Sequence, residues 1–318
     1  MVTDTAGLGD QNFNDLANRG GKKAAQDFGI DWHVLESQDA TAYVPNLTSA
    51  AEQGELSIGV GFYLTDAITS VAQQFPDDKF LLIDSSSDAP NVESVTFKEQ
   101  EGAFLAGIVS GLFTKTNKLG FVGGQKIPPV IHYQVGFQAG VKSVNPQATV
   151  AISYVDSFDD IQLGKEYALA QFNQGADIVF PAAGRTGIGC YEAVKEKGKP
   201  GGEFWVIGAD VDQDHLAPGY QLCVSSKGVD VAVFDTIKSV VDGNFEPGPK
   251  TLGLKENGVG LETPNNRVPA DIMAVVEQYK QAIIAGQFTV PTTEDELKAF
   301  QPPAVGTPVA SPAASPTA

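Results

Sequence analysis

LSIGVGFYLTDAITSVAQQFPDDKFLLIDS, residues 56–85, decides the fold class of this chain. It consists of an apolar run at 56–62, a stretch of helical length at 64–75 and a second apolar run at 79–85. Short continuous apolar runs are typical of strands that are buried on both faces of a sheet. The stretch therefore predicts a strand–helix–strand unit with parallel strands.

The same alternation continues along the chain. Further strands are expected at 118–124, 149–155, 176–184, 204–210 and within 251–262. Further helices are expected at 101–113, 130–144, 162–175, 187–198, 229–245 and 270–288. Strands that alternate with helices indicate an α/β fold with doubly wound parallel sheets. A helix is also expected to begin near Phe13, after a loop at 4–9.

Length and charge narrow the class of protein. The chain has 318 residues, which suggests about two domains, and a formal net charge of -18. Such an acidic surface repels phosphates, so nucleic acid and anionic membrane surfaces are poor partners. The Pro/Ala/Ser-rich tail at 301–318 is expected to be disordered.

Cysteines and histidines give no sign of metal or redox chemistry. Cys190 and Cys223 lack CxxC spacing, so we expect two small buried side chains, with a disulfide as the alternative. His33, His132 and His215 are scattered and are expected to be structural or exposed. No apolar run is long enough to span a membrane, and no signal peptide is visible.

Ligands of open α/β sheets bind beyond the carboxyl ends of the strands, so the loops that follow strands are the candidate site. Asp84 and Asp210 each end a strand, where a carboxylate either accepts from a ligand hydroxyl or caps a turn. Phe13 and Phe158 lie in polar loops, where each either anchors its loop in the core or stacks on a flat heterocycle.

The glycine loop GRTGIG at 184–189 does not match a dinucleotide-binding fingerprint. Its spacing is GxxGxG rather than GxGxxG, and it lacks the GK[ST] of a phosphate-binding loop. We interpret it as a tight turn into a helix whose N–H groups face a polar ligand. The strand-end loops also lack a Ser-His-Asp set and an HExxH motif, so catalysis is not indicated.

Taken together, the segments resemble the basic membrane lipoprotein family, the purine-nucleoside-type substrate-binding proteins of ABC importers. The resemblance rests on DTAGLGDQNFND, the stretch from AAEQGEL to LLIDS, SVTFKEQEGAFLAGIVSGL, AAGRTGIGCYEAVKEKG, WVIGADVDQ and SSKGVDVAV. It implies a type I periplasmic-binding-protein fold, in which two lobes joined by three crossovers close around one nucleoside. It also implies a monomer without cofactor or metal, an ABC permease as partner and an extracytoplasmic location.

The resemblance assigns roles to particular residues. Asp4, Asn12 and Phe13 match the first ligand loop, and Phe13 and Phe158 match the pair that stacks on the base. The positions that hold the ribose and the ring edges are matched by Asp84, Asp210 and Lys227. The positions of the glycine loop are matched by Gly184 and Thr186. Arg185 departs from the family, where a small residue is usual, and either reaches the ligand or points to solvent.

The resemblance also predicts domain boundaries. Lobe one is expected at 1–97 plus 224–247, and lobe two at 98–223 plus 248–300. Only Met1 to Thr3 precede the ligand loop, so we expect a longer first strand, an export signal and a lipidated cysteine upstream.

Three other functions stay open at this point. One is a receptor of the same fold for another small polar ligand, such as a pentose or a signalling metabolite. Another is a nucleoside hydrolase, which would need a cluster of acids. The third is a cytoplasmic sensor domain, favoured if no signal lies upstream.

Overall fold

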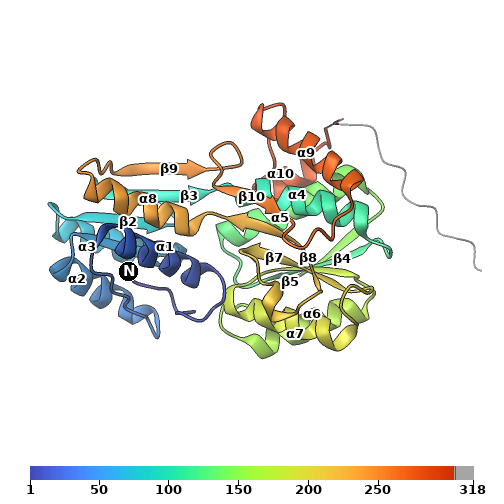
Figure 1. The fold of residues 1–318 in the computed structure, drawn as a ribbon, viewed down its shortest axis with the longest axis horizontal. Coiled ribbons are helices and arrows are strands. Elements are labelled where there is room, and N and C mark those ends of the chain that lie inside the picture. The colour runs from blue at the N-terminus through green and yellow to red at the C-terminus, as the bar shows by residue number, and fades with distance from the viewer. Residues whose placement is uncertain (304, 306–318) are drawn as a thin grey trace, which may run out of the picture.

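The structure, a computed structural model, describes residues 1–303 and 305. Its strands form two separate sheets that lie side by side along the long axis of the molecule (Figure 1). One sheet has four strands in the order β1-β2-β3-β9, and the other has six in the order β10-β8-β7-β6-β4-β5. We call each sheet with its covering helices a lobe, and the four-stranded one is lobe one. The expected tail at 301–318 falls largely outside the described residues.

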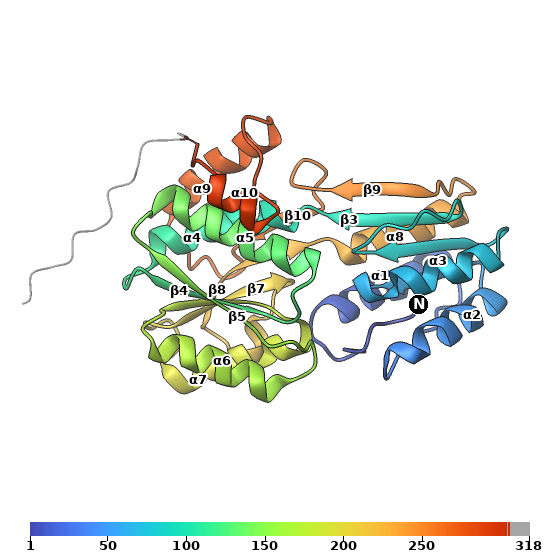
Figure 2. The ribbon, with the colours of Figure 1, turned by 180° about the vertical axis from the view of Figure 1, so that it is seen from behind.

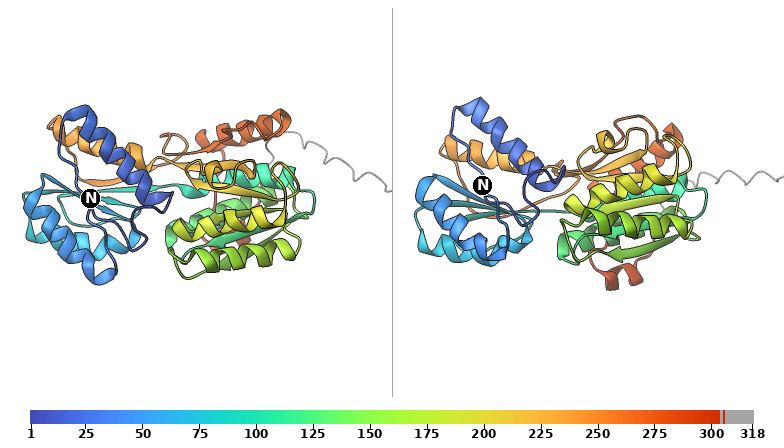
Figure 3. Two further views of the ribbon diagram at one scale, coloured as in Figure 1. Left: turned by 60° about the horizontal axis from the view of Figure 1, so that its bottom comes forward. Right: turned by 90° about the horizontal axis from the view of Figure 1, so that it is seen from below.

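Lobe one is a parallel sheet with helices on both faces, as Figure 3 shows. Its strands are β1 (Leu56–Val60), β2 (Lys79–Ile83), β3 (Val92–Phe97) and β9 (Gly248–Leu252). Its helices are α1 (Phe13–Phe28), α2 (Tyr43–Gln53), α3 (Thr65–Gln74) and α8 (Val229–Val241). In β2, Phe80 and Leu82 pack in the cluster under α2 and α3, while Leu81 and Ile83 pack in the cluster that includes α1 and α8. The strand therefore reads as a continuous apolar run because both of its faces are buried.

The first residues of the chain extend this sheet beyond β1. Val2 forms parallel bridges with both Leu35 and Gly59. The Val2 N–H donates to Ile58 O at 2.7 Å, and Leu35 N–H donates to Met1 O at 2.9 Å. This pairing places the loop that begins at Asp4 beyond the carboxyl end of the sheet.

Lobe two is also layered, with α6 and α7 on one face of the sheet and α4, α5 and α9 on the other (Figures 1 and 2). Its strands are β4 (Lys118–Gly123), β5 (Thr149–Tyr154), β6 (Ile178–Ala182), β7 (Trp205–Asp210), β8 (Gln221–Lys227) and β10 (Val259–Glu262). Its helices are α4 (Glu99–Phe113), α5 (Pro128–Val144), α6 (Ile161–Asn173), α7 (Gly187–Lys197), α9 (Ala270–Ile284) and α10 (Glu294–Ala299). The doubly wound α/β fold is confirmed. One described strand departs from the parallel arrangement, since β10 is antiparallel to β8.

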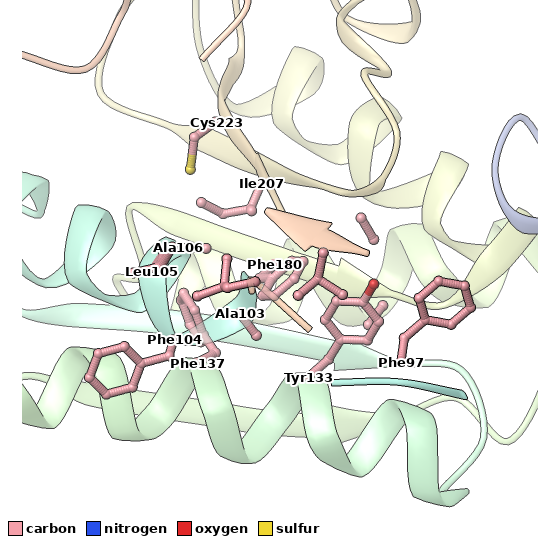
Figure 4. Packing of buried hydrophobic residues seen from close by; sticks show 14 of the residues in the cluster. Phe97, Ala103, Phe104, Leu105, Ala106, Tyr133, Phe137, Phe180, Ile207 and Cys223 are labelled. Carbon is pink, nitrogen blue, oxygen red and sulfur yellow. The ribbon is translucent and has the colours of Figure 1, made fainter. Parts of the chain in front are cut away.

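An aromatic core fixes α5 on the sheet of lobe two. The ring of Phe180 on β6 lies 5.7 Å from that of Tyr133 and 5.3 Å from that of Phe137, between ring centroids (Figure 4). Tyr133 thus has its ring in the core, and its hydroxyl is directed to the strand ends, where it donates to Asp210.

The chain passes between the two sheets three times, after β3, after β8 and after β9. Two of the expected boundaries are wrong. Residues 224–227 were assigned to lobe one, but β8 pairs with β7 and β10 and belongs to lobe two. Residues 248–252 were assigned to lobe two, but β9 pairs in parallel with β3 in lobe one.

These corrections have a physical reason. β9 is the edge strand GPKTL, and its residues are half-buried or exposed, so it lacks the apolar run that marks an inner strand. The crossing after β8 falls at Gly228, four residues later than expected, because β8 continues its pairing with β7 and β10 through Ser226 and Lys227.

The expectation for the cysteines is confirmed. Cys190 and Cys223 are free, buried thiols, and burial raises the pKa of Cys190 to about 12. Across residues 1–303 and 305, the helices are all too short or too polar to cross a membrane.

Candidate functional site

A cavity lies between the lobes, where the carboxyl ends of both sheets face each other. It encloses about 620 Å³ of empty space, including the part open to solvent. The lining includes eight predicted residues: Asp4, Asn12, Phe13, Asp84, Phe158, Gly184, Asp210 and Lys227.

Thr186, the ninth predicted residue, does not line the cavity. It is fully buried, and its Oγ1 accepts from the N–H of Asp160 at 2.9 Å and donates to the carbonyl of Ser157 at 3.1 Å. Thr186 N–H also donates to Phe158 O at 3.1 Å. Thr186 therefore supports the loop that carries Phe158.

Arg185 does not line the cavity. Its Nη1 lies 3.3 Å from Asp159 Oδ1, and both side chains are about half exposed. Of the two interpretations of this departure from the family pattern, the structure fits the solvent-facing one.

Phe13 and Phe158 provide two aromatic walls from opposite lobes. Phe13 is the first residue of α1, and Phe158 follows β5; both are half-buried. The ring of Phe158 lies so close to Gly124 that a Cβ on this glycine would approach the ring to 2.4 Å. Gly124 therefore leaves the space that Phe158 needs beside the cavity.

Asp84 and Asp210 both have left-handed backbone conformations, with φ of 67° and 63°. Such angles are sparse among residues other than glycine and cluster at functional sites. Asp84 Oδ2 accepts from Lys227 Nζ at 2.6 Å, while its Oδ1 is buried without a partner. Both residues line the cavity.

Lys227 is the cation of the cavity, and acids surround it. Its Nζ lies 2.6 Å from Asp84 Oδ2 and 3.0 Å from Glu99 Oε1. Burial alone lowers the pKa of Lys227, but the charges of Asp84, Glu99 and Asp210 raise it well above its ordinary value. The ammonium is therefore charged at all physiological pH values.

The acids respond differently to this environment. Burial raises the pKa of Asp84 to about 7, against the opposing effect of Lys227. Burial also raises the pKa of Asp210. Burial acts in the same direction on Glu99, but Lys227 and His132 outweigh it and hold the pKa of Glu99 below its usual value.

The loop that begins at Asp4 is held by hydrogen bonds to its own acids. Asp4 Oδ1 accepts from Ala6 N–H at 3.0 Å and from Asn14 Nδ2 at 2.9 Å. Asp10 accepts from the N–H groups of Asn12 and Asn14 at the start of α1, and burial raises its pKa to about 6. The Oδ1 atoms of Asn12 and Asn14 are buried without partners, so both can accept from a ligand.

The sequence interpretation missed several residues of the site. Tyr133 and Asn14 line the cavity, and Glu99 contacts Lys227 from behind. Tyr133 and Asn14 lie inside helices and Glu99 begins one, where the apolar periodicity indicates only a core face. For Asp10, the spacing to the start of α1 was a usable signal, because an acid just before a helix caps it.

This arrangement suits binding rather than metal chemistry. Aromatic walls take a flat ring, and buried carboxylates accept from hydroxyl groups while a lysine donates. Among the residues that the structure describes, there is no cluster of His, Cys, Asp and Glu fit to hold a metal ion.

Two α/β lobes joined by three crossings around a cavity define a substrate-binding protein of the type I periplasmic-binding-protein architecture. A solved ABC transporter solute-binding protein from Aeropyrum pernix superimposes with a TM-score of 0.86 at 31% identity, covering 94% of both chains. The chain belongs to the Bmp family of PnrA-like ABC transporter substrate-binding proteins, whose model matches residues 1–294.

Curated relatives agree with this assignment. The nucleoside-binding protein BmpA of Lactococcus lactis, from an ABC transporter, is 35% identical over 92% of this chain and 88% of its own length. A CD4+ T-cell-stimulating antigen of Listeria monocytogenes is 38% identical over 92% of this chain and 87% of its own. An uncharacterized lipoprotein of Pyrococcus horikoshii is 37% identical over 82% of this chain and 67% of its own.

Proposed function

We propose that this protein is the extracytoplasmic substrate-binding protein of an ABC importer and that it carries a purine nucleoside between its lobes. The observation that carries the proposal is the pairing of two aromatic walls, Phe13 and Phe158, with the buried carboxylates of Asp84 and Asp210 in one cavity. The walls suit a purine ring, and the carboxylates suit vicinal ribose hydroxyls. The name of the Lactococcus relative supports the same ligand class.

Energetics are consistent with a scavenging receptor. A nucleoside of about 19 non-hydrogen atoms at roughly 0.5 kcal/mol per atom would bind with about 9–10 kcal/mol. This corresponds to a dissociation constant on the order of 0.1 μM.

The proposal also covers partners and location. The permease of the importer receives the loaded protein, which acts as a monomer. A lipid anchor outside this chain would hold it at the outer face of the membrane, in line with the lipoprotein among its relatives.

Thermal shift separates the ligand classes. Inosine, guanosine and adenosine should each raise the melting temperature, whereas ribose and free bases should not. Mass spectrometry of the ligand that co-purifies gives an independent identification. If ribose alone stabilised the protein as strongly as inosine, the purine assignment would fail.

A sugar receptor is the second candidate, because the cluster of Asp84, Asp210 and Lys227 is by itself a hydroxyl-binding site. The ribose arm of the same experiment tests it. Incubation with inosine, followed by assay for free hypoxanthine, tests hydrolysis; we expect intact inosine.

A further inference from the structure

We propose that Glu99, which lies outside the cavity lining, positions Lys227 for ligand binding and that His132 holds Glu99 in place. Neither residue is among those that the sequence pointed to. The inference rests on the proposed function of the cavity, since its effect is read through ligand affinity.

Both carboxylate oxygens of Glu99 are occupied. Oε1 lies 3.0 Å from Lys227 Nζ, and Oε2 lies 3.0 Å from His132 Nδ1. The Glu99 and Lys227 side chains are each 2% exposed, whereas His132 is 27% exposed. The orientation of the carboxylate is therefore fixed from two sides, by β8 and by α5.

The positions of these residues in the chain explain why the contact matters. Glu99 begins α4 directly after the first crossing between lobes, and Lys227 ends β8 directly before the second. Asp84 follows β2 in lobe one. Lys227 is thus bound to its own lobe by Glu99 and to the opposite lobe by Asp84.

The two acidic partners of Lys227 therefore have different roles: Asp84 also binds the ligand, whereas Glu99 only holds the lysine. A ligand hydroxyl that binds Asp84 competes with Lys227 for the same carboxylate, of which only Oδ1 is free. Glu99 keeps a second counter-charge on the ammonium, so Lys227 stays in position while Asp84 serves the ligand. Without that counter-charge, Lys227 would be drawn onto Asp84 and the cavity would lose an acceptor.

Several charged or titratable groups surround this contact. Asp84 faces Lys227 of β8, Glu99 of α4, Asp210 of β7 and the hydroxyl of Tyr133 of α5. On its other side, His132 faces Glu99 and lies near Glu296 of α10. The charge of Glu99 is one of the causes that raise the pKa of Asp84, so its removal shifts the titration of Asp84 to lower pH.

The test compares Glu99→Gln with a matched control, Glu93→Gln. Glu93 on β3 is also buried and has a lysine partner, Lys250 Nζ at 3.0 Å, but it does not line the cavity or contact Lys227. Calorimetry with inosine from pH 5.5 to 8.5 should show about ten-fold weaker binding by Glu99→Gln at neutral pH, in the range of couplings within one hydrogen-bond network. The pH midpoint of its affinity should also lie lower than in the wild type, while Glu93→Gln keeps the wild-type midpoint.

A second arm needs no ligand. Because the pKa of Asp84 is raised in the folded state, protonation of Asp84 favours folding at low pH. This contribution to stability is lost as pH rises through about 7. Glu99→Gln reduces this contribution, so the loss of melting temperature relative to wild type should be larger at pH 5.5 than at pH 8. A loss of melting temperature that does not vary with pH would contradict the electrostatic coupling of Glu99 to Asp84.

The role of His132 is tested by His132→Gln, which keeps a donor to Glu99, and by His132→Leu, which removes it. Leucine should weaken inosine binding several-fold, and glutamine should largely restore it.

If wild type binds inosine and Glu99→Gln binds it equally with the same midpoint, the inference is wrong. If wild type binds no nucleoside, the proposed function fails, and the ligand-free arm still decides the inference. If Glu99→Gln does not fold, the two His132 variants decide it: equal affinities would overturn the role of Glu99.

Discussion

At the scale of single residues, the site is marked by conformations that its side chains disfavour. Asp84 and Asp210 end strands with φ of 67° and 63°, where glycine would be unstrained. Each such residue costs on the order of 1–3 kcal/mol, which the fold retains only where the surroundings impose it. These strained conformations direct the carboxylates of Asp84 and Asp210, which come from opposite lobes, into one cavity.

Protonation of Asp84 should couple ligand affinity to pH. Since burial raises its pKa to about 7, we expect affinity for inosine to rise between pH 5.5 and 8, as the carboxylate becomes an acceptor. Ligand-free stability should contain an opposite trend, because a raised carboxyl pKa stabilises the folded state below about pH 4 and this contribution is lost through about pH 7. Calorimetry and thermal melting of wild type and Asp84→Asn over this range measure both. A wild-type affinity that does not change with pH would contradict the assignment.

Phe13 and Phe158 should each contribute to binding through stacking. Phe13→Ala or Phe158→Ala is expected to weaken inosine binding by about 1–3 kcal/mol with the fold intact, because each ring is only half-buried. The control is Phe28→Ala, since Phe28 is also half-buried but packs against Phe234, away from the cavity. If calorimetry gives wild-type affinity for both cavity variants, the aromatic sandwich is wrong.

The two strand-end aspartates should recognise hydroxyl groups. Asp84→Asn and Asp210→Asn replace a charged acceptor, at an expected cost of about 1.5–3 kcal/mol for a ribonucleoside. A 2′,3′-dideoxynucleoside lacks the ribose hydroxyls and should be affected much less. The ratio of the two affinities is the measurement, and a ratio equal to that of wild type in both variants would rule out a sugar-binding role.

At the scale of elements, burial decides what the sequence can predict. Inner strands such as β2 are apolar on both faces, so their positions and the α/β class were predicted correctly. The edge strand β9 carries Pro249 and Lys250 and was assigned to the wrong lobe, because its pairing with β3 depends on contacts far away in the sequence. The antiparallel course of β10 likewise has no local signal.

The site follows the same rule. Residues in loops after strands, such as Asp84 and Phe158, were found because a polar or aromatic side chain there has few structural explanations. Tyr133 and Glu99 belong to helices whose buried faces look alike from the sequence. Thr186 was misplaced because the glycine loop was matched as a unit, although only Gly184 in it lines the cavity.

The turn before α7 should act on binding through Thr186. Thr186→Val removes the hydroxyl that joins Asp160 N–H and the Ser157 carbonyl, leaving both without that partner. We expect a stability loss of about 1–3 kcal/mol and weaker inosine binding, because the loop of Phe158 loses its support. Thr186→Ser keeps the hydroxyl and should behave like wild type in denaturant unfolding and calorimetry. A valine variant with wild-type stability would show that the loop holds itself.

At the scale of the whole molecule, polar contacts join the lobes beside the cavity. The hydroxyl of Tyr63 in lobe one donates to Gln125 Oε1 in lobe two. On another side, His215 Nε2 of lobe two lies 3.1 Å from Gln11 Oε1 of lobe one, and Gln213 Nε2 donates to Gln11 O at 3.0 Å. These contacts exist only while the lobes are close together, so they favour the closed arrangement over an open one.

Removal of these contacts should therefore shift the balance between open and closed forms without touching the ligand. Gln125 and His215 do not line the cavity, so the double variant Gln125→Ala/His215→Ala leaves the lining intact. Each lost hydrogen bond shifts the balance by about 0.5–1.5 kcal/mol, and apparent affinity falls with the fraction of closed protein. We expect inosine to dissociate several-fold faster in stopped-flow measurements and the ligand-free protein to have a larger radius of gyration in X-ray scattering. Gln162→Ala, which removes an exposed bond within α6, is the control. If neither the dissociation rate of inosine nor the radius of gyration changed, the three chain segments that connect the lobes would by themselves determine the closed geometry.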